Sequence, residues 1–146
     1  MAISNVIQFK YTVQPCDIDN LHHVNNQVYL KWFMHGAEKH SDLIGWTFDK
    51  MIAGGEGWVV RKTEIEYLSQ LLLGQEILLR TWVETAEKAS SERRYEVVRV
   101  SDKKMVTRGM TLWVWLNYKK FRPARIPQEL IEDFVKYDPG GPIDLF

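Results

Sequence analysis

The stretch CDIDNLHHVNNQVYLKWF, Cys16–Phe33, places two Asp, two His and three Asn within ten residues, directly before an apolar run. A polar surface turn would not ordinarily lead into Val-Tyr-Leu-Lys-Trp-Phe. A polar stripe then recurs at spacings of four, three and four residues, at Lys31, His35, Glu38 and Asp42. The remaining wide apolar arc predicts a helix from about Asn26 to Ile44 that is enclosed by other structure. The polar cluster should therefore lie at the N-terminus of a buried helix.

Alternating residues predict strands on both sides of this helix. VIQFKYTVQ puts Ile7, Phe9, Tyr11 and Val13 on one face before Pro15 ends the strand. A glycine-rich loop, AGGEG, precedes four further strands, in WVVRKTEIEYL, EILLRTWVE, ERRYEVVRV and MVTRGMTLWVWLN. In the first of these four, the alternation of apolar residues shifts between Val60 and Ile65, which is typical of a β-bulge.

A short proline-initiated helix follows from Pro127 to about Val135, and the tail YDPGGPIDLF is typical of a loop. The predicted fold class is therefore α+β: one five-stranded antiparallel sheet around one long helix, with a short C-terminal helix. Residues 1–146 should form a single domain, since a chain of this length can bury one core.

The last predicted strand is apolar on both faces. Val106, Met110, Leu112, Val114 and Leu116 share one face, while Trp113 and Trp115 point to the other. Both faces of the sheet should then be covered, yet the central helix can cover only one. We therefore expect Trp113 and Trp115 to face outward and to mark an association surface.

Composition excludes several classes of protein. The 19 basic and 19 acidic residues give a net charge of zero, which argues against an electrostatic nucleic-acid binder. The single cysteine excludes an internal disulfide and fits a reducing compartment. No apolar stretch approaches the about 18 residues of a membrane span, and no signal-peptide pattern opens the chain. We expect a cytoplasmic protein without membrane or nucleic-acid partners. Asp17, Asp19, His22 and His23 lack a recognised metal-ligand spacing.

One motif consists of Asp-x-Asp, four further residues and then VNNQVYLKWF. It resembles the signature of hotdog-fold thioesterases of the 4-hydroxybenzoyl-CoA thioesterase superfamily. It is also similar to acyl-ACP thioesterases, whose active-site segment reads like HVNN before an aromatic helix. VVRKTEIEYLSQLLLGQEILLRT and RPARIPQEL resemble later segments of the family, so the resemblance covers nearly the whole chain. It implies an acyl-CoA or acyl-ACP substrate, no cofactor, and an active site formed between two subunits. The protein should be at least a dimer, and with outward Trp113 and Trp115 a tetramer.

The resemblance assigns roles to three residues. Asp19 matches the carboxylate that acts as nucleophile or general base, and His23 matches the histidine of the acyl-ACP pattern. Asn26 stands where many bacterial acyl-CoA members carry His, and Leu21 stands where the acyl-ACP pattern has Asn. We therefore expect Asp19, His23 and Asn26 to be catalytic, with an Asp-Asn-His triad incomplete at Leu21.

Thioester hydrolysis needs an attacking oxygen and a site for the developing oxyanion, whereas the thiol leaves readily as thiolate. The start of a helix offers unpaired N–H groups, so Val24, Asn25 and Gln27 are candidates for the oxyanion site beside Asn26. Glu64 is a possible second carboxylate. CoA phosphates could be bound by Arg61, Lys62, Arg122 and Arg125.

Other interpretations remain open for the same residues. Asp17 and Asp19 are typical of Asx turns, and Asn25 or Asn26 of a helix N-cap. One alternative function is a hotdog hydratase or dehydratase, in which Asp19 and His23 would serve as the acid–base pair. The other is a non-catalytic acyl-thioester-binding protein, which the departures at Leu21 and Asn26 would suit.

Overall fold

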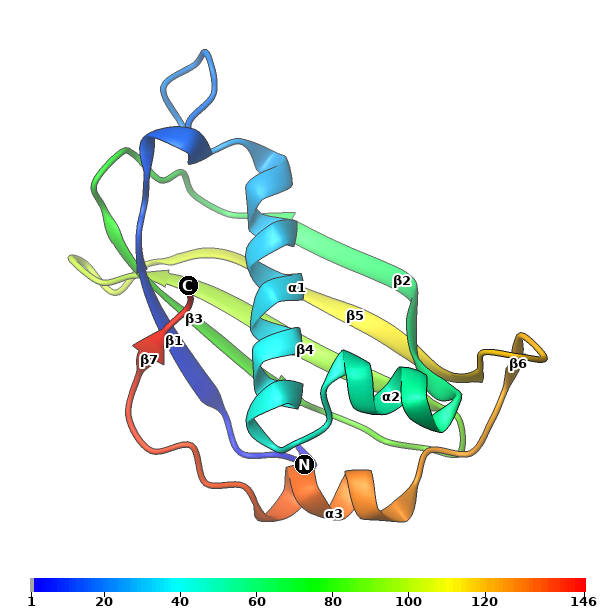
Figure 1. The fold of residues 1–146 in the computed structure, drawn as a ribbon. Coiled ribbons are helices and arrows are strands. Elements are labelled where there is room, and N and C mark those ends of the chain that lie inside the picture. Colours follow the sequence, from blue (N-terminus) through cyan, green and yellow to red (C-terminus); the bar gives the residue numbers. More distant parts are fainter. Residues whose placement is uncertain (1) are drawn as a thin grey trace.

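The computed structural model describes residues 2–146, in which one curved sheet wraps around the long helix α1 (Figure 1). The helices are α1 (Asn26–Leu43), α2 (Phe48–Gly54) and α3 (Gln128–Lys136), with a 3-10 turn at Pro15–Asp17. The strands are β1 (Ile7–Thr12), β2 (Glu56–Tyr67), β3 (Glu76–Val83), β4 (Ser90–Arg99), β5 (Met105–Asn117), β6 (Arg122–Pro123) and β7 (Ile143–Asp144). This is the α+β arrangement predicted from the sequence, with the predicted central helix in place.

The sheet runs in the order β2-β5-β4-β3-β1-β7, and β6 pairs with β5 outside this path. All pairings are antiparallel except that of β7 with β1. The predicted bulge is present, because the register of β2 against β5 shifts between Val60 and Lys62. The sheet thus leaves β2 at one edge and β7 at the other.

Two counts differ from the prediction. The sheet has seven strands rather than five, because the two-residue strands β6 and β7 add to the five long ones. Helix α2 was not predicted and overlaps the segment assigned to a glycine-rich loop. It begins after Thr47, whose side chain accepts a hydrogen bond from the Lys50 N–H, and it ends before the C-cap Gly55, which has φ 75°.

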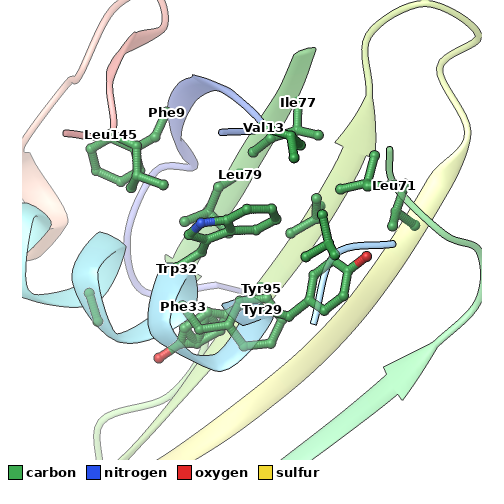
Figure 2. Close-up of a cluster of buried hydrophobic side chains, with 14 of the residues drawn as sticks. Phe9, Val13, Tyr29, Trp32, Phe33, Leu71, Ile77, Leu79, Tyr95 and Leu145 are labelled. Carbon is green, nitrogen blue, oxygen red and sulfur yellow. The ribbon is translucent and has the colours of Figure 1, made fainter. Parts of the chain in front are cut away.

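The main core lies between α1 and the sheet. Trp32 and Phe33 of α1 are fully buried, and Figure 2 shows Trp32 beside Leu79 and Phe33 beside Tyr95. A Cβ at Gly36 would lie 2.6 Å from Cδ2 of Leu79. The absence of a side chain at Gly36 therefore lets the backbone of α1 pack closely on β3.

A second core cluster joins α2 and α3 to the same face of the sheet. Its buried members are Trp46, Val83, Trp115, Ile126, Leu130 and Phe134. Trp115 is 2% exposed and packs edge-on against Trp46 and Trp58. The prediction that Trp113 and Trp115 face outward is therefore wrong: both lie on the side of the sheet covered by helices.

The reason is a register shift in β5. Val97 pairs with Thr107 but Val98 pairs with Met105, so Val106 is an extra residue in the strand. Val106 joins the core under α1. Gly109, three residues later, also faces α1, since a Cβ at that position would contact Phe33. The alternation that the sequence suggested across Val106 is thus broken, and the face of every later residue changes.

The opposite face of the sheet carries charged pairs rather than a second helical layer. Ion pairs join Arg80 to Glu96 at 3.3 Å and Arg108 to Glu66 at 3.1 Å. Within residues 2–146, the helices lie on one face of the sheet only. The tetramer was expected because Trp113 and Trp115 were predicted to face outward, and they do not. No helix in the described part of the chain is long and apolar enough to cross a membrane.

Candidate active site

A tight loop from Asp19 to His23 protrudes next to the N-terminus of α1 (Figure 1). The Asp19 N–H donates to the His23 carbonyl at 2.9 Å, and Ile18 pairs with Val24 just outside the loop. Oδ1 of Asp19 accepts the Leu21 N–H at 2.9 Å, an Asx turn, and His22 at the tip has φ 64°. One carboxylate oxygen of Asp19 is therefore held by the loop, while the side chain stays partly exposed.

The other aspartate of the motif, Asp17, fixes this loop to the sheet. Its buried carboxylate accepts the Tyr11 hydroxyl at 2.6 Å and the Gln14 N–H at 2.9 Å. Burial, followed by the hydrogen bond to Asp17, holds the pKa of Tyr11 above its ordinary value. The Asp17 carbonyl also accepts the Asn25 N–H at 2.9 Å. Asp17 thus ties strand β1 to the start of α1.

The N-terminus of α1 leaves one backbone donor free among those expected at the oxyanion site. The Val24 N–H donates to the Leu71 carbonyl at 3.0 Å, and the Gln27 N–H to Oδ1 of Asn25, the N-cap, at 2.9 Å. The Asn25 N–H is held by Asp17 as described. Within residues 2–146 the Asn26 N–H has no acceptor. Its carbonyl accepts the Tyr67 hydroxyl at 3.3 Å, which joins the helix start to the end of β2.

The structure brings Asp19, His23 and Asn26 into the same loop–helix junction. No hydrogen bond within the described residues joins their side chains directly. Asp19 and His23 are half-buried and Asn26 is exposed, so the junction is open to solvent. The arrangement offers a carboxylate oxygen and a helix N–H to a ligand approaching from outside.

The other candidate residues lie on the sheet, away from this junction. Glu64 faces away from α1 and pairs with Lys62 at 2.9 Å, and this hydrogen bond lowers the pKa of Glu64. Within one chain the structure does not bring Glu64 to Asp19. Arg61 and Lys62 are exposed in the middle of β2. Arg122 and Arg125 are exposed near the start of β2, since Glu56 pairs with Asn117 and Asn117 with Arg122.

Sequence reasoning missed a cavity of about 380 Å³ between the C-terminal half of α1, α2 and the sheet. Its lining includes Met34, Met51, Trp46, Trp58, Trp113 and Arg93. Met34 is eight residues along α1 from Asn26, so the cavity begins about 12 Å along the helix from its N-terminus. The volume falls within the range of small-molecule sites, about 300–1,000 Å³.

Arg93 is a buried cation at this cavity. Its Nη1 lies 3.0 Å from Nδ1 of His40 and donates to Oγ1 of Thr81 at 3.1 Å. Burial, helped by the Arg93 charge, lowers the pKa of His40 to about 2. His40 is thus neutral and can accept from Arg93. The signal for this pair was the alternation of β4, which puts Arg93 in phase with the buried Ser91, Tyr95 and Val97.

In the described part of the chain, no group of three or more His, Cys, Asp or Glu residues is placed to hold a metal ion.

Comparison with known proteins places this chain and its fold among thioesterases. Residues 4–134 match the family model described as the acyl-ACP thioesterase N-terminal domain. The chloroplastic acyl-acyl carrier protein thioesterase ATL3 of Arabidopsis thaliana is 23% identical over 136 residues, which cover 93% of this chain and 71% of that protein. The family predicted from the sequence motifs is therefore confirmed.

Solved structures share the fold. A putative oleoyl thioesterase from Lactobacillus plantarum superposes with a TM-score of 0.84 at 15% identity, over 90% of this chain and 51% of that one. A 1,4-dihydroxy-2-naphthoyl-CoA thioesterase from Synechocystis superposes with the same TM-score and identity, over 90% of this chain and 97% of that one. The chain thus spans about half of the first protein and almost all of the second, and the predicted hotdog fold is confirmed.

Proposed function

We propose that this chain, which belongs to the acyl-ACP thioesterase family over residues 4–134, hydrolyses acyl thioesters to a free acid and a thiol. The carrier is CoA or acyl carrier protein, the two carriers named for its relatives. The observation that carries the proposal is the unpaired Asn26 N–H at the start of α1, next to the loop that presents Asp19.

The proposed chemistry uses both groups. The thioester carbonyl oxygen accepts the Asn26 N–H, which stabilises the negative charge that develops there, aided by the positive end of the helix dipole. Asp19 supplies the attack, either by taking a proton from water or by attacking the carbonyl carbon itself. The carbon–sulfur bond then breaks and the thiol departs as thiolate. When Asp19 is the nucleophile, the acyl group is left as an anhydride on Asp19, and water hydrolyses it to release the free acid and restore the carboxylate. His23 and the Asn26 side chain position water or substrate.

A dimer would complete this site. β2 is an edge strand of 12 residues that, within residues 2–146, pairs only with β5 along its length. Such an edge presents unpaired N–H and C=O groups that a second strand can bind. Two copies pairing antiparallel about the middle of β2 would bring the Tyr67 end of one beside the Glu56 end of the other. Arg122 and Arg125 of one protomer would then approach the α1 N-terminus of its partner, where the phosphates of the carrier would lie.

The test is free-thiol release from a panel of acyl-CoA and acyl-ACP substrates by wild type and Asp19→Asn. Asparagine keeps an oxygen to accept the Leu21 N–H, so the loop is preserved while the charge is lost. We expect turnover by wild type and a loss of about 100-fold or more in the variant, the scale of a general-base contribution. Asp138→Asn is the matched control and should leave the rate unchanged, because Asp138 is exposed and likewise accepts a backbone N–H two residues on, from Gly140 at 3.4 Å.

Equal activity of wild type and Asp19→Asn would show that Asp19 is only a turn residue. If no substrate releases thiol and an enoyl thioester loses its enoyl absorbance, the protein catalyses hydration and the proposed hydrolysis is wrong. Single turnover in ¹⁸O-labelled water, with enzyme in excess, tests for a covalent intermediate. Label in the Asp19 carboxylate with unlabelled product acid indicates an anhydride that water opens at Asp19, whereas labelled product shows that water attacked the acyl carbonyl.

A further inference from the structure

Arg93 carries an unmatched charge on the inside of the protein. It is 4% exposed, and its partners, His40 and Thr81, are both neutral. Its guanidinium also lies 5.6 Å from the centre of the Phe134 ring. None of the ion pairs among residues 2–146 involves Arg93. A buried cation without a counter-ion is costly, since burial normally requires a paired charge.

The position of Arg93 is fixed from three sides. Thr81 on β3, His40 on α1 and Phe134 on α3 hold the guanidinium, and Thr81 is itself anchored because its hydroxyl donates to the Arg94 carbonyl at 2.8 Å. Burial lowers the pKa of Arg93 only to about 10, so the group is a cation at neutral pH. A rigid, charged guanidinium with few partners is arranged to bind a planar anion, because its N–H groups match a carboxylate.

The rest of the cavity wall is mostly apolar. Trp46, Trp58 and Trp113 and the methionines Met34 and Met51 line it together with Arg93. The acidic residues of the lining, Glu38 and Asp42, are exposed on α1 and form no ion pair with Arg93. The cavity therefore combines one buried positive charge with walls suited to a hydrocarbon chain.

We propose that this cavity binds the carboxylate of an aliphatic chain, with Arg93 on the carboxylate and the tryptophans and methionines along the chain. The inference rests on the proposed function, because thioester hydrolysis both takes up acyl chains and releases them as carboxylates. Two sources supply the same chemistry. One is the free fatty acid made by hydrolysis, and the other is an acyl thioester that carries a second carboxylate at its far end.

Binding to the full chain is measured by tryptophan fluorescence, with decanoate and decanol as probes at pH 7.5. The two ligands share a chain and differ in charge, and three tryptophans in the cavity wall report on both. Wild type should bind decanoate at least tenfold more tightly than decanol. Arg93→Met should lose that preference, binding decanoate at least tenfold more weakly and decanol as before.

Arg94→Met is the matched control. Arg94 is the next residue on β4, exposed on the opposite face and paired with Glu92 at 2.9 Å, so its loss should leave both affinities unchanged. Arg93→Lys keeps the charge but loses the paired N–H groups of the guanidinium, so it should show an intermediate preference for decanoate over decanol. This variant replaces Arg93→Met in the test if Arg93→Met does not fold. Equal affinity of wild type for decanoate and decanol would overturn the proposal. So would tight decanoate binding by folded Arg93→Met.

Steady-state kinetics identifies the source. If the ligand is the product, decanoate inhibits wild type competitively, and the inhibition weakens at least tenfold in Arg93→Met. If it is a second carboxylate, the CoA monothioester of decanedioic acid has a higher kcat/KM than decanoyl-CoA in wild type but not in Arg93→Met. Because binding is measured without turnover, Asp19→Asn should retain it. Failure of the carboxylate site and failure of hydrolysis are therefore separate results.

Discussion

Asp17 and Asp19 stand two residues apart in the same motif, but their carboxylates have different surroundings. Asp17 is buried with the Tyr11 hydroxyl and the Gln14 N–H, whereas Asp19 uses one oxygen for a turn and leaves the other free. These partners give Asp17 a structural role, whereas the catalytic role expected for Asp19 stays a prediction. Spacing alone could not distinguish them, because the partners of Asp17 come from the preceding strand.

At the same scale, buried His40 makes stability depend on pH. Its pKa is about 2 in the folded protein against an ordinary 6.5, so below pH 6.5 the unfolded chain takes up a proton that the folded chain does not. The contribution of neutral His40 to the free energy of unfolding is complete above pH 6.5 and is lost as the pH falls. We expect the free energy of unfolding at pH 5.5 to be about 1–1.5 kcal/mol below that at pH 7.5.

Urea unfolding at pH 7.5, 6.5 and 5.5 measures this loss. His40→Gln, which can still accept from Arg93, should remove most of it, whereas His35→Gln should retain it, because His35 stacks on Phe146 at the surface of α1. An unchanged pH dependence in His40→Gln would show that His40 is not the responsible group.

Among the elements, α1 and the five long strands follow from periodicity, but helix α2 and the facing of residues in β5 do not. The extra residue at Val106 reverses the faces of β5, and only the partner strand reveals it. Helix α2 ends in two glycines, and its seven residues are too few for a helical period to be recognised. Arg93 was missed for a related reason: its alternation with Tyr95 and Val97 was visible, but arginine is seldom buried.

The packing of α1 on β3 makes Gly36 a position where alanine should be harmful despite its better helix propensity. The added methyl would meet Leu79, which is fully buried and has little room to move. We expect Gly36→Ala to lower the free energy of unfolding by about 1–3 kcal/mol, the cost of overpacking. Chemical denaturation measures the change.

Gly54→Ala provides the comparison. Gly54 also lies in a helix, but no atom is within 4 Å of the position that its Cβ would occupy. Alanine there should be neutral or stabilising by up to about 1 kcal/mol, the propensity difference from glycine. Similar effects of the two substitutions would mean that Leu79 moves aside freely.

For the whole molecule, the sequence motifs predicted the family and the hotdog topology because they occur in order along nearly the entire chain. The oligomeric state was harder to predict from the sequence. The tetramer expected from outward Trp113 and Trp115 depended on a face assignment that the structure reverses. The open edge at β2, which favours a dimer, appears only once the order of strands is known.

A charge in the middle of that edge should separate the dimer. Val60 is exposed near the midpoint of β2, so Val60→Glu would place two like charges near the two-fold axis of a β2–β2 pair. Light scattering at micromolar concentration should find wild type as a dimer and the variant as a monomer, with hydrolysis lost in parallel. Val135→Glu, a similarly exposed apolar residue on α3, should remain dimeric and active. A wild-type monomer that hydrolyses thioesters would refute the shared site.

The two edges of the sheet differ in kind. At the edge opposite β2, the last residues of the chain lie along β1: Ile143 and Asp144 pair with Phe9 and Lys10, and the Leu145 N–H donates to the Lys10 carbonyl at 3.0 Å. The C-terminal segment therefore occupies part of the edge that a further copy would need. A dimer paired through β2, as proposed above, would present only these partly covered edges, so raising the protein concentration should fill the dimer and not extend a fibre.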